Sequence, residues 1–181
     1  MQNKLLKDFE TFRGSLIAAI FDYVQKAENQ TVFLENDINL NEIKWTPISN
    51  PFLVNDTNLY FKGIFNGQSH KIYGLKVVGS GLFGTVRGTI INTEICNCDI
   101  SYTYSNVSDT LTNCGGICGS LMKSSSDGIV DESCKIDNCK VSGSISITSG
   151  KDSNVYAGGI AGYVYGGIIN NCSADAKVSA T

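Results

Sequence analysis

The sequence predicts an all-β protein: a short parallel β-helix, or β-solenoid, with an N-terminal amphipathic α-helix as its cap. The composition combines 42% hydrophobic residues with 19 glycines in 181 residues, which is too apolar for a disordered chain and too interrupted for a helical bundle. After residue 30 the apolar residues recur with a period of two and are often β-branched or aromatic. A Gly-x-x-Gly tetrad also recurs, as in repeat proteins. We therefore expect two regions, a capping or docking helix over 1–30 and a β-helix over 31–181.

The predicted helix spans residues 3–28. Its apolar residues recur at spacings of three and four and form one stripe, Leu5, Phe9, Phe12, Leu16, Ile20 and Val24. A single amphipathic helix has to bury such a stripe on another element. The stripe predicts a cap over the first coil of the solenoid, with docking onto a partner protein as the alternative.

Internal repetition defines the rest of the chain. The tetrad occurs three times, separated by 35 and then 43 residues, as Gly81-Leu82-Phe83-Gly84, Gly116-Ile117-Cys118-Gly119 and Gly159-Ile160-Ala161-Gly162. A second block, 88–92, returns 78 residues later as 166–170, and its middle copy is expected at Gly128–Val130 running to Val141. Each repeat is interpreted as one turn of a parallel β-solenoid in which glycine allows the corner.

The tetrads predict a packed core. We expect Leu82, Ile117 and Ile160 to point inward and to stack on one another. The next residue shrinks from Phe83 to Cys118 to Ala161, which would taper the column.

The segment 61–72, Phe-Lys-Gly-Ile-Phe-Asn-Gly-Gln-Ser-His-Lys-Ile, followed by the tetrad 81–84, resembles the GLUG-motif β-helix repeats of bacterial and protist surface proteins. In that family the motif is Gly-Leu-any-Gly. The resemblance covers residues 31–179. It implies a right-handed parallel β-helix that serves as a spacer, a scaffold or an adhesive surface, with any catalysis in other domains.

Charge and hydropathy limit the partners and the location. With 14 Lys+Arg against 17 Asp+Glu, the net charge of −3 provides no attraction for a nucleic-acid backbone. No apolar run approaches the roughly 18 residues that a membrane span requires. No signal peptide is evident around Leu16–Phe21, which favours an intracellular chain or one within an assembled particle, whereas the family resemblance implies the cell surface.

One motif resembles a cofactor site. Residues 79–84 match the G-x-G-x-x-G fingerprint of dinucleotide-binding proteins, and Asp99 follows 20 residues after Gly79. That fingerprint requires a helix that begins at the third glycine, because the helix N-terminus binds the pyrophosphate. The residues that follow Gly84 are rich in β-branched types and predict a strand, so no cofactor is expected.

The seven cysteines are the candidates for a metal site or disulfides. They are Cys96, Cys98, Cys114, Cys118, Cys134, Cys139 and Cys172. An odd number cannot all pair within one chain, and none of the spacings is the C-x2-C of a zinc knuckle. We expect stacked core thiols, with Cys98 and Cys139 in one column and no metal; one or more disulfides, or a metal, are the alternatives.

Catalytic groups are not expected. The acidic candidates Asp99, Asp131, Glu132, Asp137 and Asp175 do not share a repeat position on neighbouring coils, as catalysis in a groove would require. We interpret them as surface charge and His70 as a turn residue. The predicted function is a non-enzymatic structural or protein-interaction module.

A carbohydrate-binding or carbohydrate-active β-helix is the alternative function. It would use a row of outward tyrosines drawn from Tyr60, Tyr73, Tyr102, Tyr104, Tyr163 and Tyr165.

The C-terminal coil is expected to be open. The last predicted strand ends at Val178-Ser179, and only Ala180 and Thr181 follow it. Solenoid ends are normally capped because they expose core residues and unpaired backbone. Either the native protein is longer than this sequence, or another copy or a partner covers the last coil. We expect self-association or binding of a protein partner through Ile168, Ile169 and Val178.

Overall fold

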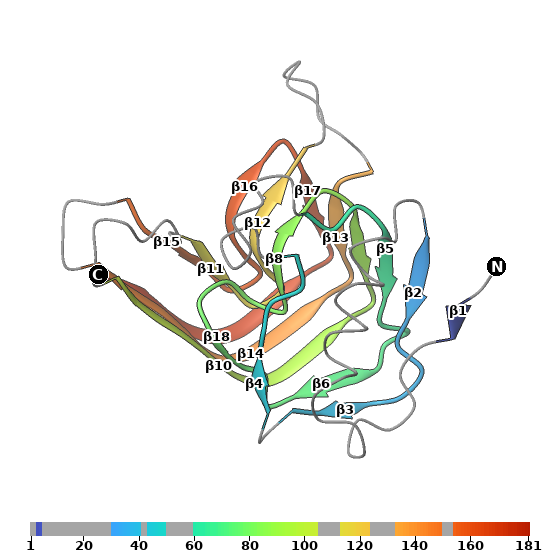
Figure 1. Cartoon of the computed structure of the whole chain (residues 1–181), viewed down its shortest axis with the longest axis horizontal. Helices are drawn as coiled ribbons and strands as arrows, with labels where there is room; N and C mark the ends of the chain where they lie inside the picture. Colours follow the sequence, from blue (N-terminus) through green and yellow to red (C-terminus); the bar gives the residue numbers. More distant parts are fainter. Residues whose placement is uncertain are drawn as a thin grey trace.

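The structure is a computed structural model that describes residues 3–4, 30–40, 43–49, 60–104, 113–123, 133–149 and 154–181. All regular elements in these ranges are β-strands, as predicted (Figure 1). The predicted capping stripe from Leu5 to Val24 lies outside the described residues. The first two residues of the predicted helix instead form β1 (Asn3–Lys4), which pairs with β2. Within the described ranges, no helix is long and apolar enough to cross a membrane.

The strands stack into parallel sheets. One sheet has the order β1, β2 (Thr31–Phe33), β5 (Ile64–Asn66), β9 (Thr89–Ile91), β13 (Lys135–Asp137) and β17 (Ile168–Asn170). A second, longer sheet holds β3 (Ile38–Asn39), β4 (Lys44–Trp45), β6 (Lys71–Tyr73), β7 (Lys76–Val78), β10 (Glu94–Tyr104), β14 (Lys140–Ser149) and β18 (Ser173–Ala180).

The third side of the molecule is formed by β8 (Phe83–Val86), β12 (Cys118–Met122) and β16 (Ala161–Tyr165). A two-stranded sheet joins β11 (Asn113–Gly115) to β15 (Tyr156–Gly158). The chain visits the sheets in turn and then returns to the first one coil further along, and the pairing is parallel at each step (Figure 1). This arrangement is a parallel β-helix.

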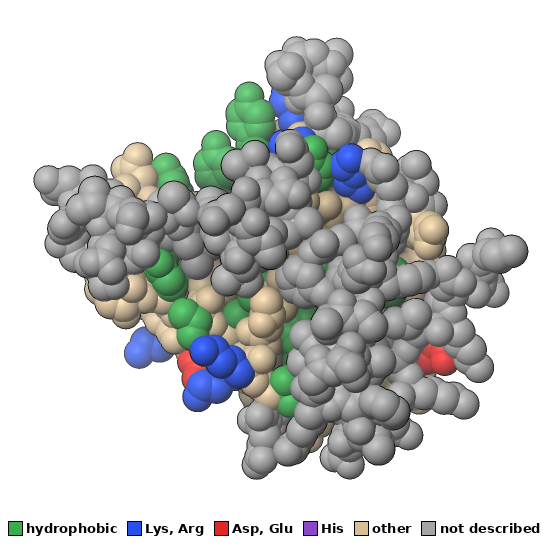
Figure 2. Space-filling view, viewed as in Figure 1, with side chains coloured by type: hydrophobic (Ala, Val, Ile, Leu, Met, Phe, Trp, Pro, Cys, Tyr) green, Lys and Arg blue, Asp and Glu red, His purple; other side chains and the backbone are tan. Residues whose placement is uncertain are grey.

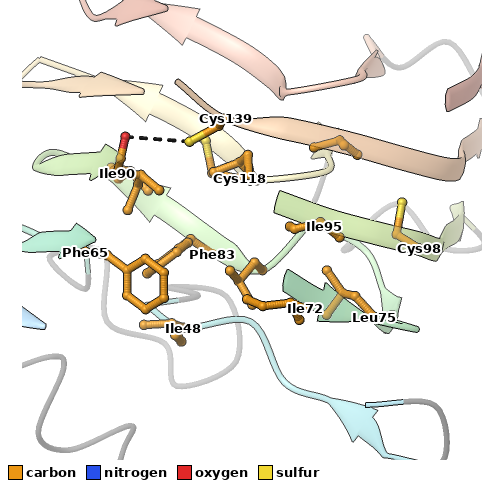
Figure 3. Close-up of a cluster of buried hydrophobic side chains, with 14 of the residues drawn as sticks. Ile48, Phe65, Ile72, Leu75, Phe83, Ile90, Ile95, Cys98, Cys118 and Cys139 are labelled. Carbon is orange, nitrogen blue, oxygen red and sulfur yellow. Dashed lines mark hydrogen bonds between the residues drawn. The ribbon is translucent and has the colours of Figure 1, made fainter. Parts of the chain in front are cut away.

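The core consists of columns of inward side chains, one from each coil. In the first sheet the register aligns Val32, Phe65, Ile90, Ile136 and Ile169. Side chains from all three sides meet in the interior (Figure 3). The tapering column is present, because Cys118 lies in register with both Phe83 and Ala161. The ring of Phe83 fills the wide end, where its centroid lies 5.1 Å from that of Phe61 and 5.5 Å from that of Phe65.

The tetrad glycines are required by the close approach of neighbouring coils. A Cβ atom on Gly81 would lie 2.0 Å from the carbonyl oxygen of Gly115, and one on Gly116 would lie 2.6 Å from that of Gly159. Neither glycine has a positive φ. The distance between backbones therefore excludes a side chain at these positions.

The predicted register differs from the observed one in the 78-residue block. Ile90 aligns through Ile136 with Ile169, whereas the prediction aligned it with Ile168. The segment from Val164 to Ile169 is one residue longer than the one from Val86 to Ile90, and Gly166 within it has a φ of 76°.

The middle copy was also placed wrongly. The prediction placed Gly128–Val130 in register with β9 and β17, but the strand found there is β13. Gly128–Val130 lies outside the described residues. Val141 aligns with Ile95 and Ala174, and Ile145 is the residue that aligns with Ile100 and Val178. The register shifts between Ile95 and Cys98 because β10 carries one residue more than β14 there.

An asparagine ladder holds the corner that follows the first sheet. Asn92, Asn138 and Asn171 all have left-handed backbone, with φ values of 52°, 53° and 49°. Asn138 Nδ2 donates to Asn92 Oδ1 at 2.8 Å, and Asn92 Nδ2 donates to Asn66 Oδ1 at 3.1 Å. Asparagine suits this corner because it tolerates positive φ and its amide bonds to the coils on both sides.

Substitutions at Asn92 separate these two roles. Asn92→Ala should lower the free energy of unfolding by about 2 kcal/mol, because it places an alanine at positive φ and removes the amide hydrogen bonds. Asn92→Gly should cost less, because glycine accepts the conformation and only the ladder is lost. Urea midpoints would measure both. Equal losses in the two variants would contradict a role for the backbone conformation.

Candidate association surface

The last coil, formed by β16, β17 and β18, lies at the end of the solenoid. Each of these three strands is the terminal strand of its sheet, and no described strand pairs with its outer edge. At the other end, β1 pairs with the outer edge of β2. Within the described residues, the backbone groups on the outer edges of the last coil therefore have no strand partner.

The core columns become exposed at this coil. Val86 and Leu121 are 0% exposed, but Val164, which follows them in register, is 43% exposed. Ile90 and Ile136 are 0% exposed, whereas Ile169 is 39% exposed. In the third column, Ile100 and Ile145 are 0% exposed and Val178 is 41% exposed. We call the surface formed by Val164, Ile169, Ala174 and Val178 the end surface.

Two of the three residues predicted for the open coil, Ile169 and Val178, are on the end surface. Ile168 is not, because it aligns with Lys135 and Thr89, one position away from the inward column. The sequence analysis missed Val164. The signal for it was present, since Val86, Leu121 and Val164 recur at the same 35- and 43-residue steps as the tetrads.

The tetrad positions belong to the core next to this surface. Leu82 and Ile117 are buried, while Ile160 in the last coil is half-buried and packs against the core. Phe83 N–H donates to Ile117 O at 2.8 Å, and Ile117 N–H donates to Ile160 O at 2.9 Å. The remaining tetrad glycines, Gly84, Gly119, Gly159 and Gly162, lie in the same stacked segments.

The outer face of the long sheet carries paired charges. Lys71 Nζ lies 3.4 Å from Glu94 Oε1, and Lys76 Nζ lies 3.3 Å from Asp99 Oδ2. Figure 2 shows basic side chains beside an acidic one along the lower edge of the molecule. Both pairs join neighbouring strands, as expected for cross-strand ion pairs.

The remaining acidic candidates do not converge. Asp137 lies 4.0 Å from Lys135 and accepts a hydrogen bond from Asn171, and Asp175 lies on β18. Asp131 and Glu132 are outside the described residues. Among the described residues, no group of three or more His, Cys, Asp or Glu side chains could hold a metal ion.

His70 lies in a turn, where its Nδ1 is 3.3 Å from Asp37 Oδ1. The same carboxylate accepts the backbone N–H of Lys71 at 2.9 Å. This backbone hydrogen bond, helped by His70, lowers the pKa of Asp37. The His70 side chain thus contacts the corner of the preceding coil, which contains Asp37.

The cysteines are thiols. All seven are free, and five of them, Cys98, Cys114, Cys118, Cys134 and Cys139, are buried. Burial raises the pKa of Cys98 and Cys114 to about 11 and that of Cys139 to about 12. Cys139 Sγ donates to Ile90 O at 3.9 Å within the core (Figure 3).

The predicted column of Cys98 and Cys139 is wrong. Cys98 aligns with Gly143, and Cys139 is next to Cys172, whose Sγ accepts its backbone N–H at 3.4 Å. The misplaced middle copy causes this difference, because the prediction aligned Ile100 with Val141, whereas the observed register aligns Ile100 with Ile145.

The tyrosines of the carbohydrate hypothesis are on different sheets. Tyr60 lies under the Arg87 guanidinium, with 3.8 Å between the Arg87 Cζ and the ring centroid. Tyr73 and Tyr102 belong to the long sheet, and Tyr163 and Tyr165 belong to β16. The described tyrosines therefore form no single row.

The dinucleotide fingerprint lacks its helix. Gly84 lies inside β8, and the segment after it continues as strands β8 and β9. No helix N-terminus is available there for a pyrophosphate.

Comparison with known proteins supports the fold. The family model described as the GLUG motif matches residues 153–179, which confirms the predicted resemblance over that segment. The chain is also similar to a crystal structure described as a putative immunoglobulin A1 protease from Bacteroides ovatus, with 23% identity and a TM-score of 0.58. The similarity covers 87% of this chain and 54% of that one, so this chain spans about half the length of that protein. No curated protein matches the chain.

Alanine substitutions at two positions of one core column should show that the inner residue contributes more to stability than the residue in the last coil. Ile136→Ala should lower the free energy of unfolding by about 2–5 kcal/mol, as is usual for a fully buried aliphatic side chain. Ile169→Ala removes the same atoms from the same column and should cost about 1 kcal/mol, because solvent already reaches Ile169. Urea denaturation of dilute protein would measure both. Equal losses would contradict the exposed position of Ile169.

Thiol titration tests whether the cysteines are free thiols and whether the core protects them. At pH 8 the native protein should react slowly with a thiol reagent, because the buried thiols with raised pKa values form little thiolate. The half-buried Cys96 and Cys172 should react first. After unfolding without reductant all seven should react, and a smaller number would indicate disulfides.

Proposed function

We propose that this chain is a non-enzymatic β-solenoid module that associates with another protein chain through its end surface. The observation that carries this proposal is the exposure of three core columns at one coil, at Val164, Ile169 and Val178. Each of these residues is in register with residues that are fully buried one coil earlier. A protein chain placed on this end would bury all three.

The physical gain from such association has two parts. Burial of a whole Val or Ile side chain contributes about 1.5–3 kcal/mol, so covering the exposed parts of three such side chains contributes a few kcal/mol. Strand pairing at the outer edges of β16, β17 and β18 adds backbone hydrogen bonds. Both parts favour a protein partner that offers an apolar surface and a free strand edge.

The residues also favour a structural role over a catalytic one. Glu94 and Asp99 pair with lysines of neighbouring strands, and Asp37 contacts His70 and the backbone of Lys71, as in structural ion pairs. The name protease applies to the Bacteroides ovatus protein, and this chain matches only 54% of it. We propose that the shared part is scaffold and not the catalytic part.

Charge substitutions at the end surface test the proposal. The wild-type chain should show concentration-dependent association in sedimentation-velocity experiments. The double variant I169E/V178E should remain monomeric, because two carboxylates in the contact oppose burial. Circular dichroism should show that it keeps its β structure.

Val78→Glu is the matched control. Val78 is 57% exposed on β7, but it lies on the outer face of the long sheet and away from the end surface. This variant should associate like the wild type. A strictly monomeric wild-type chain at high concentration, with hydrogen exchange showing a folded last coil, would overturn the proposed function.

A further inference from the structure

We propose that the partner is a second copy of this chain, joined across a two-fold axis by antiparallel pairing of β18 with β18 of the copy. This inference rests on the proposed function and specifies its geometry. It comes from three features of β18: its free edge, its residue pattern and its unpaired charges.

The free edge of β18 presents the backbone groups of its even-numbered residues. Ser173 N–H donates to Cys139 O at 3.0 Å, and Thr181 N–H donates to Ile147 O at 3.0 Å, so the odd-numbered residues bond to β14. Successive residues of a strand direct their N–H and C=O groups to opposite sides. The groups of Ala174, Ala176 and Val178 therefore point to the outer edge.

The residue pattern of β18 is symmetric about Ala176. The strand reads Ser-Ala-Asp-Ala-Lys-Val-Ser-Ala from Ser173 to Ala180. In an antiparallel pair centred on Ala176, Val178 lies opposite Ala174 of the copy, and Ser179 lies opposite Ser173. Asp175 lies opposite Lys177, and this ion pair occurs twice in the dimer.

This register also gives hydrogen-bond partners to the free backbone groups of β18. With Ala176 opposite its own copy, the outward groups of Ala174, Ala176 and Val178 form the hydrogen-bonded pairs. Asp175 and Lys177 then occupy the non-hydrogen-bonded pair, in which opposite Cα atoms are only about 4.5 Å apart. The two charged side chains are on the outer face, since they align with the outward residues Ser142 and Ser144 of β14.

The neighbouring registers that preserve these hydrogen bonds are unfavourable. Centring the pair on Asp175 places two aspartates opposite each other, and centring it on Lys177 places two lysines opposite each other. Like charges directly opposite in a sheet are destabilising. The pattern thus selects one alignment.

Among the described residues, neither Asp175 nor Lys177 has an ion-pair partner. On β14 their neighbours are Ser142 and Ser144, which carry no charge. Elsewhere on the same sheet, neighbouring strands supply the opposite charge, as in Lys71–Glu94 and Lys76–Asp99. In the last coil the opposite charges stand two residues apart on one strand, and a reversed copy places an opposite charge directly across from each of them.

Val164 and Ile169, the end-surface residues outside β18, are also compatible with this two-fold axis. The turn between β16 and β17 lies across the cross-section from β18 (Figure 1). A two-fold axis through Ala176 and normal to the long sheet therefore brings β16 of one copy over β17 of the other. The exposed Val164 would then be covered by Ile169 of the second copy, and the isologous contact closes as a dimer.

Charge reversal tests the register. Asp175→Lys places two pairs of lysines in the dimer contact, and Lys177→Asp places two pairs of aspartates there. Each single variant should raise the dimer dissociation constant by on the order of tenfold. The double variant D175K/K177D restores two opposite-charge pairs, and its dissociation constant should return to within about threefold of the wild-type value.

Sedimentation equilibrium would measure these constants, with circular dichroism as the check on folding. Asp99→Lys is the matched control, because Asp99 is an outward charge on β10, two strands away from the free edge. It should leave the dimer unchanged. Single variants as tight as the wild type, a double variant that is not rescued, or open-ended polymers in place of dimers would overturn the two-fold pairing. If I169E/V178E is still monomeric in that case, the proposed function stands; if the wild type is monomeric, both fail.

Discussion

The structure depends on one constraint: a coil of the solenoid cannot cover its own core and relies on the coils on both sides. Strands stack at about 4.8 Å in each sheet, so an inward side chain is buried mainly by its equivalents one coil before and after it. Ile90 and Ile136, which have equivalents on both sides, are fully buried, and Ile169, which has an equivalent on one side only, is not. The stability of the core and the exposure of the end surface therefore have the same physical origin.

The short distance between coils also explains the most regular features of the sequence. Gly81 and Gly116 leave no room for a Cβ atom, because the carbonyl oxygens of the next coil occupy that position. At the corner after the first sheet, Asn92 and Asn138 combine left-handed backbone with amide hydrogen bonds between coils. Glycine and asparagine thus perform different tasks: glycine permits contact between coils, and asparagine links them.

Sequence repetition was sufficient for the fold but not for the register. No residue is inserted within any of the three tetrads, so the column of Phe83, Cys118 and Ala161 was predicted correctly. The block containing Ile168 and Ile169 follows a turn that is one residue longer, and a shift by one residue moves a strand's side chains to the opposite face. No local pattern marks such an extra residue, nor the bulge in β10 that shifts its register by one residue between Ile95 and Cys98. The candidate site was therefore predicted at the correct coil, but with Ile168 in place of Val164.

The outward charges of the long sheet differ in whether a neighbouring strand supplies an opposite charge. Asp99 on β10 pairs with Lys76 on the preceding coil, so its charge is satisfied inside the solenoid. The equivalent of Asp99 on β14 is Ser144, which requires no partner, and on β18 it is Lys177. A lysine there has no acid to face on β14, whereas a reversed copy of β18 offers Asp175 at the opposite position. Among the three edge strands of the last coil, β18 thus carries charges that favour an antiparallel copy over a parallel one, because a parallel copy in register would place lysine beside lysine and aspartate beside aspartate. By this argument the same strand that exposes the core also restricts what can cover it.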